Sequence, residues 1–441
     1  MNKKTENKAV SPWQWVPSLY FAQGIPYVVV MSVAVILFKR MGMSNTDIAL
    51  YTSGLNLPWV IKPLWSPLVD LLKTKRWWIV VMQILVGAGL AGIALTIQGP
   101  LAFRYCLAFM WLLAFSSATH DIAADGFYML GLNEKKQAYF VGIRNTFYRF
   151  AVIFGQGMLV MFAGWLEQRY AREMPETAAI PQAWSLTFYL LTILFALLFV
   201  YHYLFLPHPR RDTCTLPPQQ ASAGRVFKEF LGTFTSFFQK KHIVSALIFI
   251  LLYRFAEAQL VKITSPFLLD TPATGGLALS TAEVGFIYGT IGVIALTIGG
   301  IVGGIAMARR GLKSCLWTMT IAMNLPNIVY LYLSFARPES IGIISGCVAI
   351  EQFGYGFGFT SLTYFMMLFS NGKHQTAHYA ICTGFMALGL MLPGMISGWI
   401  EESIGYRAFF VWIMLCTIPS FWATHLVRKN LTDNHSDNSS R

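Results

Sequence analysis

The stretch Trp13–Phe38 reads WQWVPSLYFAQGIPYVVVMSVAVILF and contains no charged residue over 26 positions. A helix needs about 20 mostly apolar residues to cross the hydrocarbon core of a bilayer. The stretch therefore predicts a membrane-spanning helix, and the whole chain has the same character: 55% of its 441 residues are hydrophobic and only 12% are charged. Soluble domains carry about 25% charged residues, so this composition excludes a soluble enzyme and indicates a bundle of membrane helices.

Apolar runs bounded by charged residues, glycine or proline predict twelve spans in an all-α polytopic fold. The first six spans are Trp13–Phe38, Thr46–Val69, Trp77–Ile97, Leu101–Leu130, Ala138–Leu166 and Ala183–Leu206. The second six are His242–Leu269, Ser280–Ala308, Ser314–Phe335, Ile341–Phe369, Ala377–Ile400 and Tyr406–Val427.

The longest connection, residues 207–241, is rich in proline at first and then amphipathic. It predicts a cytoplasmic linker that ends in a helix on the membrane surface, with these side chains toward lipid: Phe227, Phe230, Phe234, Phe237 and Phe238. We therefore expect a six-helix half over residues 1–206, the linker over 207–241, a second six-helix half over 242–427 and a cytoplasmic tail over 428–441.

The net charge of +13 would favour nucleic acid only if it were clustered on a soluble face. Lys and Arg of membrane proteins are retained in cytoplasmic loops. Placing the N-terminus inside assigns 21 of the 33 Lys and Arg to the cytoplasmic side and 7 to the outside, and leaves 5 within spans. We predict that both termini are cytoplasmic and that nucleic acid is not a partner. The six cysteines lack metal-ligand spacing, so no metal is expected.

The two halves share landmarks at a nearly constant offset. GWLE at Gly164–Glu167 and GWIE at Gly398–Glu401 are 234 residues apart, and Asp121 and Glu351 are 230 apart. This pattern indicates a duplication. Two parallel six-helix halves with a substrate site between them form the architecture of major facilitator transporters.

A charged residue near the bilayer centre costs about 2.5–3.5 kcal/mol on insertion scales, so it usually faces the bundle interior and marks a pathway. Asp121 and Asp125 in span four are four residues apart and share one helical face. Two carboxylates on one desolvated face cannot both ionise cheaply, so one of them could take up a proton. The pair is our candidate for proton coupling. The alternative is that Asp125 pairs with loop cations. His120 points about 100° away and is expected to be buried and hydrogen-bonded.

Span five contains Arg144 and Arg149, which helical periodicity places about 140° apart. One of them can face span four while the other faces the centre of the bundle. Arg149 and its neighbour Tyr148 lie deeper in the span, so we expect Arg149 to bind either Asp121 or an anionic group of the substrate.

Span seven contains Arg254, Glu257 and Lys262. Arg254 and Glu257 can pair within their own helix or contact the substrate, and Lys262 is expected near the outer mouth. Glu351 in span ten has no basic residue in its own span, so it must be neutral, paired across the bundle or facing water. Lys62 lies among three prolines of span two, where it can line a cavity or extend to the inner surface.

Two loops resemble the cytoplasmic loop motif of the major facilitator superfamily, Gly-x-x-x-Asp-Arg-x-Gly-Arg-Lys. Residues 303–313 read GGIAMARRGLK and include Arg309 and Arg310, although Ala308 stands where the motif has its acid. Residues 66–78 read SPLVDLLKTKRWW and keep that acid as Asp70. We expect these loops, together with Lys62, to take part in gating.

Within that superfamily the chain resembles the AmpG-like muropeptide permeases, a branch that also contains acetyl-coenzyme A transporters. The most specific stretches are FAQGIP (21–26), KPLWSPLVD (62–70), SSATHDIAADGF (116–127), LYRFAEA (252–258), STAEVGFIYGTIG (280–292) and IEQFGYGFGFTSLTYFMMLFSN (350–371). On that likeness the positions that match polar residues of the family pattern are Lys62, Asp70, Asp121, Asp125, Arg149, Glu257 and Glu351.

The resemblance implies a monomeric importer of the bacterial inner membrane that brings in anhydro-muropeptides, GlcNAc-anhydro-MurNAc with or without peptide, for cell-wall recycling. It implies a proton gradient as the energy source, no cofactor and no enzymatic activity. The alternative is a related permease for another anionic solute, such as acetyl-coenzyme A, a siderophore or a sugar. The partners expected are the sugar-peptide, protons and the lipid bilayer.

Overall fold

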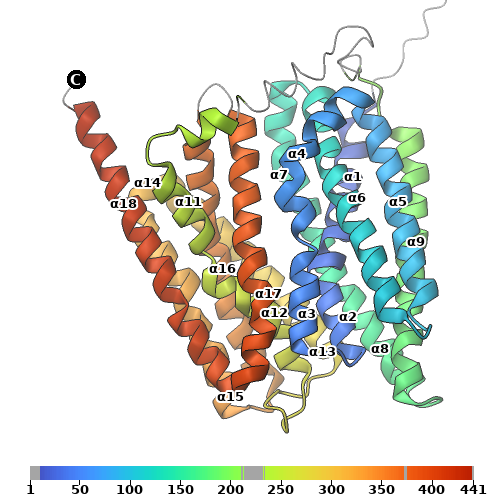
Figure 1. The fold of residues 1–441 in the computed structure, drawn as a ribbon. Coiled ribbons are helices and arrows are strands. Elements are labelled where there is room, and N and C mark those ends of the chain that lie inside the picture. The colour runs from blue at the N-terminus through green and yellow to red at the C-terminus, as the bar shows by residue number, and fades with distance from the viewer. Residues whose placement is uncertain (1–9, 210–211, 213–231, 233, 372–374, 440–441) are drawn as a thin grey trace, which may run out of the picture. The chain divides into compact units, whose positions relative to one another are not determined.

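The computed structural model describes residues 10–209, 212, 232, 234–371 and 375–439, and the regular elements in these ranges are all helices (Figure 1). The helices from the first half of the sequence are α1 Pro12–Val28, α2 Ala34–Arg40, α3 Asn45–Gly54, α4 Leu57–Leu72, α5 Lys75–Thr96, α6 Ala102–Gly131, α7 Glu134–Val152, α8 Val160–Tyr170 and α9 Glu176–Phe205. Those from the second half are α11 Ile243–Leu252, α12 Phe255–Leu269, α13 Thr281–Val284, α14 Val293–Asn324, α15 Ile328–Ala336, α16 Ile341–Ser370, α17 Gln375–Leu415 and α18 Thr417–Ser439. The predicted all-α fold is confirmed.

Eight stretches of the described residues are long and apolar enough to cross a membrane. Two of them exceed one crossing, because Thr281–Ala336 has 56 residues and His378–Asn430 has 53, whereas a single span needs about 20. A glycine outside the helical region interrupts each one: Gly311 has φ 72° and Gly405 has φ 75°. The chain is therefore a multi-pass membrane protein, and the total of twelve spans stays a prediction.

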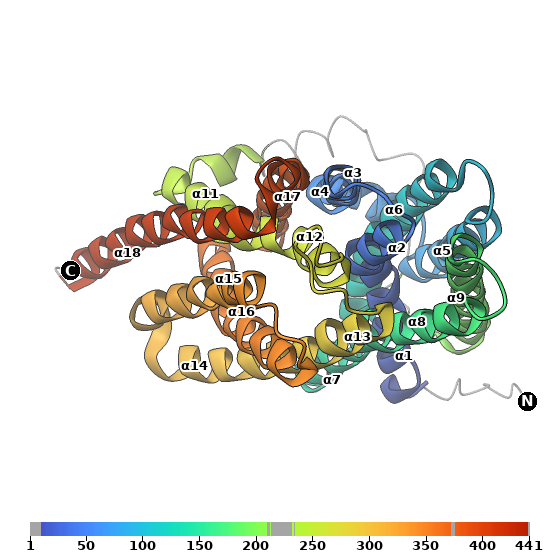
Figure 2. The same ribbon diagram turned by 90° about the horizontal axis from the view of Figure 1, so that it is seen from below.

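Contacts group the chain into two compact units. The first unit comprises residues 1–28, 64–154 and 184–221, and the second comprises residues 29–63, 155–183 and 222–441. The second unit thus combines parts of predicted spans one, two and five with the whole predicted second half, residues 242–427. Within it, α3 packs along α17 and α8 packs along α13 (Figure 2). The division into six-helix halves stays a prediction.

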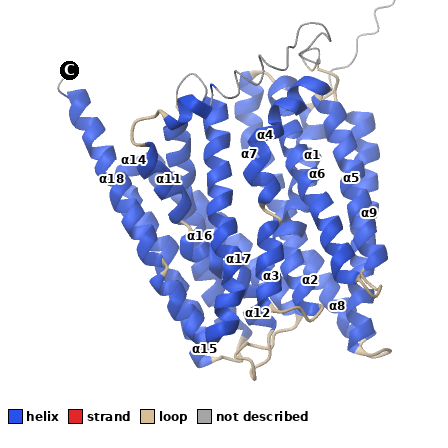
Figure 3. Ribbon diagram, viewed as in Figure 1, coloured by secondary structure: helices blue, strands red, loops and turns tan. Residues whose placement is uncertain are grey.

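Helices joined by short loops make up the described chain (Figure 3). Several predicted spans are nevertheless not continuous α-helices. Spans one, five and eight contain the π-helical segments Val29–Val33, Ile153–Leu159 and Gly285–Gly292. Span seven is broken at Tyr253 and Arg254, between α11 and α12. Such irregular backbone is frequent at functional sites, and the helix break places Arg254 directly before the first turn of α12.

Two helix starts of the second unit are capped in the same way. The Ser44 hydroxyl accepts a hydrogen bond from the backbone N–H of Asp47 at the start of α3. The Ser280 hydroxyl accepts one from the N–H of Glu283 at the start of α13, and the Glu283 carboxylate accepts one from the N–H of Ser280. These bonds satisfy N–H groups that a helix end otherwise leaves open.

Aromatic rings fill the interior of each unit. In the first unit Trp15 meets Phe127 edge-on, with ring centroids 5.1 Å apart. In the second unit Phe249 packs on Tyr253 and Phe365, with centroids 4.7 and 4.9 Å away. Since lipid tails are as apolar as these side chains, the packing stabilises the helices through close van der Waals contact rather than through exclusion of water.

The expectation that Phe237 faces lipid is wrong. Its side chain is fully buried in the second unit, 5.9 Å from the ring of Phe369 and 6.4 Å from that of Phe385. The neighbouring Lys240 donates hydrogen bonds from its ammonium to the carbonyls of Phe369 and Asn371, and burial lowers the pKa of this lysine. The end of the linker is therefore anchored on α16. Phe227 and Phe230 lie outside the described residues.

Candidate functional site

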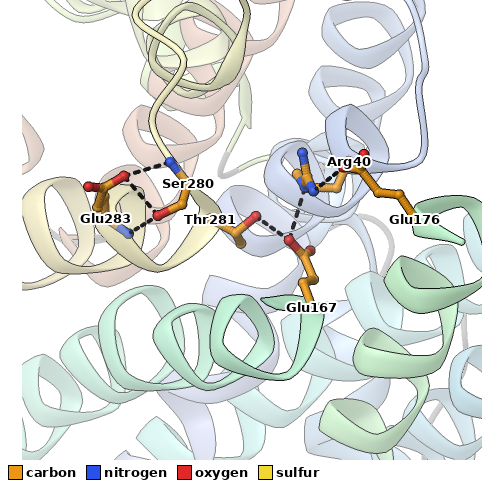
Figure 4. A network of polar contacts seen from close by, with 6 residues as sticks. All are labelled: Arg40, Glu167, Glu176, Ser280, Thr281 and Glu283. Atoms are coloured by element: carbon orange, nitrogen blue, oxygen red, sulfur yellow. Dashed lines mark hydrogen bonds and ion pairs between the residues drawn. The ribbon is translucent and has the colours of Figure 1, made fainter. Parts of the chain in front are cut away.

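A cluster of charged and polar side chains joins four segments of the second unit (Figure 4). Glu167 in α8 accepts a hydrogen bond from Nε of Arg40 at 3.1 Å and another from the hydroxyl of Thr281 at 2.7 Å. The Arg40 guanidinium also binds Glu176 at 2.9 Å. We call these four residues the Glu167 cluster. Because the Glu167 side chain is only 7% exposed, its ion pair is shielded from water.

A second group of residues, the Glu401 cluster, is also in the second unit. Lys39 forms an ion pair with Asp270 at 2.7 Å and donates to the Asn45 side chain at 2.8 Å. The Asn45 amide nitrogen donates to Glu401 at 2.6 Å and to the hydroxyl of Tyr406 at 2.9 Å. That hydroxyl in turn donates to Asp270 at 2.6 Å. The cluster ties the ends of α2 and α12 and the start of α3 to the part of α17 around its Gly405 kink.

The two clusters are built on the repeated GWLE and GWIE motifs. In the first motif, a Cβ added to Gly164 would lie 2.3 Å from the backbone nitrogen of Ala282, and the acid at its end, Glu167, binds Thr281. Only glycine allows α8 to approach the first turn of α13 this closely.

The second motif makes the equivalent contact with the other capped helix start. A Cβ added to Gly398 would lie 1.9 Å from the carbonyl oxygen of Asn45, and the acid at the end of the motif, Glu401, binds the Asn45 side chain. In both cases a glycine of one sequence half allows close backbone contact with the start of a helix from the other half. The carboxylate of the same motif accepts a hydrogen bond from a side chain at that helix start. The sequence identified these motifs as a sign of duplication but not as contact sites.

The predicted substrate residues Arg254 and Glu257 are paired with each other. The guanidinium of Arg254 makes a two-bond ion pair with one carboxylate oxygen of Glu257, both distances being 2.9 Å. It also donates to the hydroxyl of Tyr355 at 2.7 Å and lies over the rings of Tyr355 and Phe359 at 5.2 and 5.0 Å. The arginine is 8% exposed and the glutamate 6%. Of the two alternatives, pairing within the helix is the one observed.

Lys262 and Glu351 are buried in the same unit but have neutral partners. Lys262 is 3% exposed and donates to the Thr52 hydroxyl of α3 at 3.3 Å. Glu351, also 3% exposed, accepts hydrogen bonds from the Tyr330 hydroxyl at 3.2 Å and from the side-chain amide of Gln352 at 2.9 Å.

In the first unit, Asp125 is held by span one and span five. It accepts a hydrogen bond from the Tyr20 hydroxyl at 3.0 Å and forms an ion pair with Arg144 at 3.4 Å. Arg144 donates to the same hydroxyl at 3.0 Å and lies over the rings of Tyr20 and Tyr128. The Asp125 side chain is 42% exposed, so water reaches the carboxylate. The sequence analysis assigned no role to Tyr20. The only feature that could have singled it out is its position between Pro17 and Pro26 in span one.

The remaining predicted residues are dispersed. Asp121 on α6, Tyr148 and Arg149 on α7, and Lys62 on α4 are half-buried. Arg309 and Arg310 are exposed next to the Gly311 kink in α14, as expected for a loop position. The side chain of Asp70 lies outside the described side chains.

These sites can bind a ligand through ion pairs, through contacts with aromatic faces and through hydrogen bonds to carboxylates. Among the described residues no group of three or more His, Cys, Asp or Glu could hold a metal ion. The buried guanidinium of Arg254 can exchange its partner Glu257 for another carboxylate, and the rings beside it offer apolar faces to a sugar or peptide.

The sequence pattern of the Major Facilitator Superfamily matches residues 18–378. The chain belongs to this superfamily and is a membrane transporter rather than an enzyme. Solved structures agree on the fold: the nucleoside transporter NupG superimposes with a TM-score of 0.68 at 14% identity, covering 94% of this chain and 98% of its own. A D-xylose-proton symporter superimposes with a TM-score of 0.66 at 12% identity, covering 93% and 95%.

Its relatives in sequence point to one branch of the superfamily. The anhydromuropeptide permease of Escherichia coli is 24% identical over 420 residues, which cover 94% of this chain and 79% of the permease. A protein of Rickettsia conorii named AmpG 4 is 25% identical over 415 residues, which cover 92% and 93% of the two chains. The predicted resemblance to AmpG-like permeases is confirmed.

Proposed function

We propose that this transporter imports anhydro-muropeptides, GlcNAc-anhydro-MurNAc with or without peptide, together with protons. The observation that supports the proposal most is the buried Arg254, held against Glu257 between Tyr355 and Phe359, in a chain similar to an anhydromuropeptide permease. Muropeptides carry carboxylates and sugar rings. A guanidinium binds the former in a two-bond geometry, and aromatic faces pack against the latter.

In the proposed cycle a substrate carboxylate displaces Glu257 from Arg254. The exchange keeps the buried arginine paired, which matters because an unpaired buried charge is strongly destabilising. Lys262 of the same unit contributes further positive charge, and Glu351 accepts hydrogen bonds from substrate hydroxyls or amides. Arg149 and Tyr148 are proposed separately, as anion-binding residues of the first unit. A substrate without a carboxylate therefore gains less from the site.

Proton coupling is assigned to Asp125, with Asp121 as its neighbour on α6. Protonation of Asp125 removes its attraction to Arg144 and leaves the Tyr20 hydroxyl free to rotate. Because Tyr20 belongs to span one and Arg144 to span five, proton binding at one carboxylate loosens the hold on two helices. Coupling therefore acts through helix packing in the first unit.

The Glu167 and Glu401 clusters are proposed to close the outer face of the transporter. If the protein lies in a bacterial inner membrane with both termini in the cytoplasm, Lys39 and Arg40 at the end of span one are on the periplasmic side. Breaking both clusters lets the outer face open, and the loops at Lys62, Asp70, Arg309 and Arg310 serve the cytoplasmic face. The transporter works as a monomer and needs no cofactor beyond the proton gradient.

The proposal is tested by uptake into proteoliposomes of radiolabelled GlcNAc-anhydro-MurNAc, with and without its peptide, under an imposed pH gradient. We expect accumulation that collapses when the gradient is dissipated. Acetyl-coenzyme A and free glucose serve as competitors, and neither should inhibit uptake. Accumulation that does not depend on the gradient would remove proton coupling, and inhibition by acetyl-coenzyme A would assign the alternative substrate.

The matched variants are Arg254→Lys and Arg407→Lys. Both retain a positive charge, but Arg254 is buried against a carboxylate whereas Arg407 is exposed and donates to the backbone carbonyl of Ser334. Only Arg254→Lys should weaken uptake of the anionic substrate. Equal uptake by the two variants would exclude Arg254 from substrate binding.

A further inference from the structure

Four buried polar side chains form a chain across the first unit that the proposed mechanism does not use. Ser18 comes from α1, Gln83 from α5, His120 from α6 and His202 from α9. Gln83 is 1% exposed, His120 2% and His202 fully buried. We call these four residues the His202 chain. Two imidazoles bridged by one amide in an apolar interior are costly to desolvate, so their presence needs a reason.

The distances give each polar atom of His202 a partner. Its Nε2 lies 2.9 Å from the hydroxyl oxygen of Ser18, and that hydroxyl donates to the Trp15 carbonyl at 3.2 Å. Its Nδ1 lies 2.8 Å from the amide nitrogen of Gln83 and 3.1 Å from the amide oxygen. The amide nitrogen is also 3.2 Å from Nε2 of His120.

These distances allow two hydrogen-bond arrangements. In the first, the Gln83 NH2 group donates to Nδ1 of His202 and to Nε2 of His120, so both imidazoles are neutral. In the second, the Gln83 amide is turned so that its oxygen accepts from those two nitrogens. Since both amide atoms already lie within hydrogen-bonding distance of Nδ1, a rotation of one side chain exchanges the arrangements.

The second arrangement can hold an extra proton on His202 with every N–H satisfied. Nδ1–H then donates to the Gln83 oxygen, Nε2–H donates to the Ser18 oxygen, and the Ser18 hydroxyl donates to the Trp15 carbonyl. His120 interacts electrostatically with His202. Around it, α1 contributes Ser18, α5 contributes Gln83, and α9 contributes the ring of Tyr201 at 5.6 Å.

A second observation marks the other end of the chain as incomplete. Nδ1 of His120 is buried and makes no hydrogen bond within the described part of the protein. Buried polar groups are nearly always paired with protein or water.

The His202 chain meets a pocket at Ser18. This residue lines a pocket of about 410 Å³ together with Trp13, Gln14, Phe21 and Tyr201. Trp13 at the edge of the pocket is 54% exposed, so the pocket is open to its surroundings. A water molecule takes about 30 Å³ of liquid volume, so the pocket has room for several beside the Ser18 hydroxyl.

We propose that His202 is a proton-binding site of the first unit, loaded through Ser18 from the water-accessible pocket and distinct from the carboxylates of α6. Loading starts from the neutral tautomer of His202 in which Nδ1–H donates to the Gln83 oxygen and Nε2 accepts from the Ser18 hydroxyl. A hydronium ion in the pocket then gives a proton to the Ser18 oxygen while the original Ser18 proton passes to Nε2 of His202. One water molecule remains in the pocket, one O–H bond is replaced on Ser18, and one N–H bond is formed on the imidazole.

Proton binding at His202 stands on the geometry of the His202 chain, but its use in transport rests on the proposed proton coupling. The loaded imidazolium pulls the Gln83 oxygen toward α9 and fixes the tautomer of His120. His120 is the residue directly before Asp121 in the sequence. Proton binding at His202 can therefore change the hydrogen bonding of α6, the helix that contains the candidate coupling carboxylates.

The test is a pH titration of the full chain in lipid nanodiscs, with its eight histidines labelled with 15N for nuclear magnetic resonance. We expect one buried imidazole signal that changes as the pH is lowered, because the ring takes up a proton, and that is absent in His202→Gln. The matched control His425→Gln removes an exposed histidine of α18 and should leave that signal in place. A titration in which His202→Gln matches the wild-type chain would overturn the proposal.

Ser18→Ala keeps the imidazole but removes the acceptor for Nε2–H, and it carries the test if His202→Gln does not fold. We expect proton binding to weaken about tenfold, seen as a midpoint displaced by about one pH unit. An unchanged midpoint contradicts loading through Ser18. Uptake in proteoliposomes separates the two proposals. If uptake does not depend on the pH gradient but His202 still binds a proton, proton coupling is excluded and the proton-binding site at His202 is retained.

Discussion

Replacing Gly398 by alanine tests whether the Glu401 cluster holds α17 against the start of α3, as proposed for the closed outer face of the transporter. An added Cβ would lie 1.9 Å from the carbonyl oxygen of Asn45. Carbon and oxygen atoms need about 3.4 Å or more, so α17 and the start of α3 must separate by about 1.5 Å. The hydrogen bond from Asn45 to Glu401, now 2.6 Å, then exceeds the normal range.

The magnitude follows from these two effects. Overpacking of a close contact costs about 1–3 kcal/mol, and a hydrogen bond to a charged group contributes about 1.5–3 kcal/mol. Because separation relieves part of the overlap, we expect a net loss of about 2–4 kcal/mol for the closed arrangement. That loss moves the equilibrium between closed and open contacts by about 30-fold to about 1,000-fold.

The assay is a distance measurement by double electron–electron resonance. Spin labels are attached at the exposed positions Leu50 in α3 and Ser403 in α17, in a variant without the six natural cysteines. Gly398→Ala should add a longer distance to the distribution. Gly346→Ala is the matched control, because a Cβ at this helical glycine meets no atom within 4 Å, and it should leave the distribution unchanged.

The result that refutes this reasoning is an identical distance distribution in Gly398→Ala and Gly346→Ala. The equivalent motif supplies an independent check. In Gly164→Ala the added Cβ would lie 2.3 Å from the backbone nitrogen of Ala282, so α8 and α13 should separate as well. If only one of the two variants separates its helices, the two motifs are not functionally equivalent.

Three further predictions concern the coupling carboxylate, the buried arginine and a helix kink. Asp125→Asn keeps the hydrogen bond to Tyr20 but cannot exchange a proton, so gradient-driven uptake should be lost while exchange of labelled for unlabelled substrate persists. Arg254→Lys replaces the two-bond ion pair and the ring contacts by a single ammonium, and the KM for the peptide-bearing substrate should rise about tenfold or more in uptake kinetics. Gly311→Ala forces a side chain into a backbone region reserved for glycine, so thermal unfolding should show a loss of about 1–3 kcal/mol, whereas Gly304→Ala, a helical glycine with open space around its Cβ, should gain about 0.5–1 kcal/mol.

The helices were largely predictable because the bilayer imposes their length and polarity. The predicted span Ile341–Phe369 corresponds to α16, Ile341–Ser370, and the span Leu101–Leu130 corresponds to α6, Ala102–Gly131. The breaks within spans were not predicted, since a π-helical turn has no composition of its own. The helix break at Tyr253 and Arg254 is an example, because no residue pattern in this apolar run predicts that the helix ends there.

The partners within the candidate sites were harder to predict. Helical periodicity separated Arg144 from Arg149 but could not say which one faces span four, and the structure pairs Arg144 with Asp125. His120 was predicted to be buried and hydrogen-bonded, as is observed, but its partner Gln83 is 37 residues away. Such pairings depend on how helices turn about their axes, which is set by all the contacts that a helix makes.

The sequence by itself determined that this chain is an α-helical membrane transporter with charged residues inside its spans and a repeated Gly-Trp-x-Glu motif. These properties follow from local composition, because each apolar run must satisfy its own backbone hydrogen bonds in lipid. Only the tertiary structure decided that Gly164 and Gly398 each grip the start of another helix, that Arg254 is already paired, and that two distant histidines share one glutamine. Contacts between helices carry no local signature, since they arise only when side chains far apart in the chain meet at van der Waals and hydrogen-bonding distance.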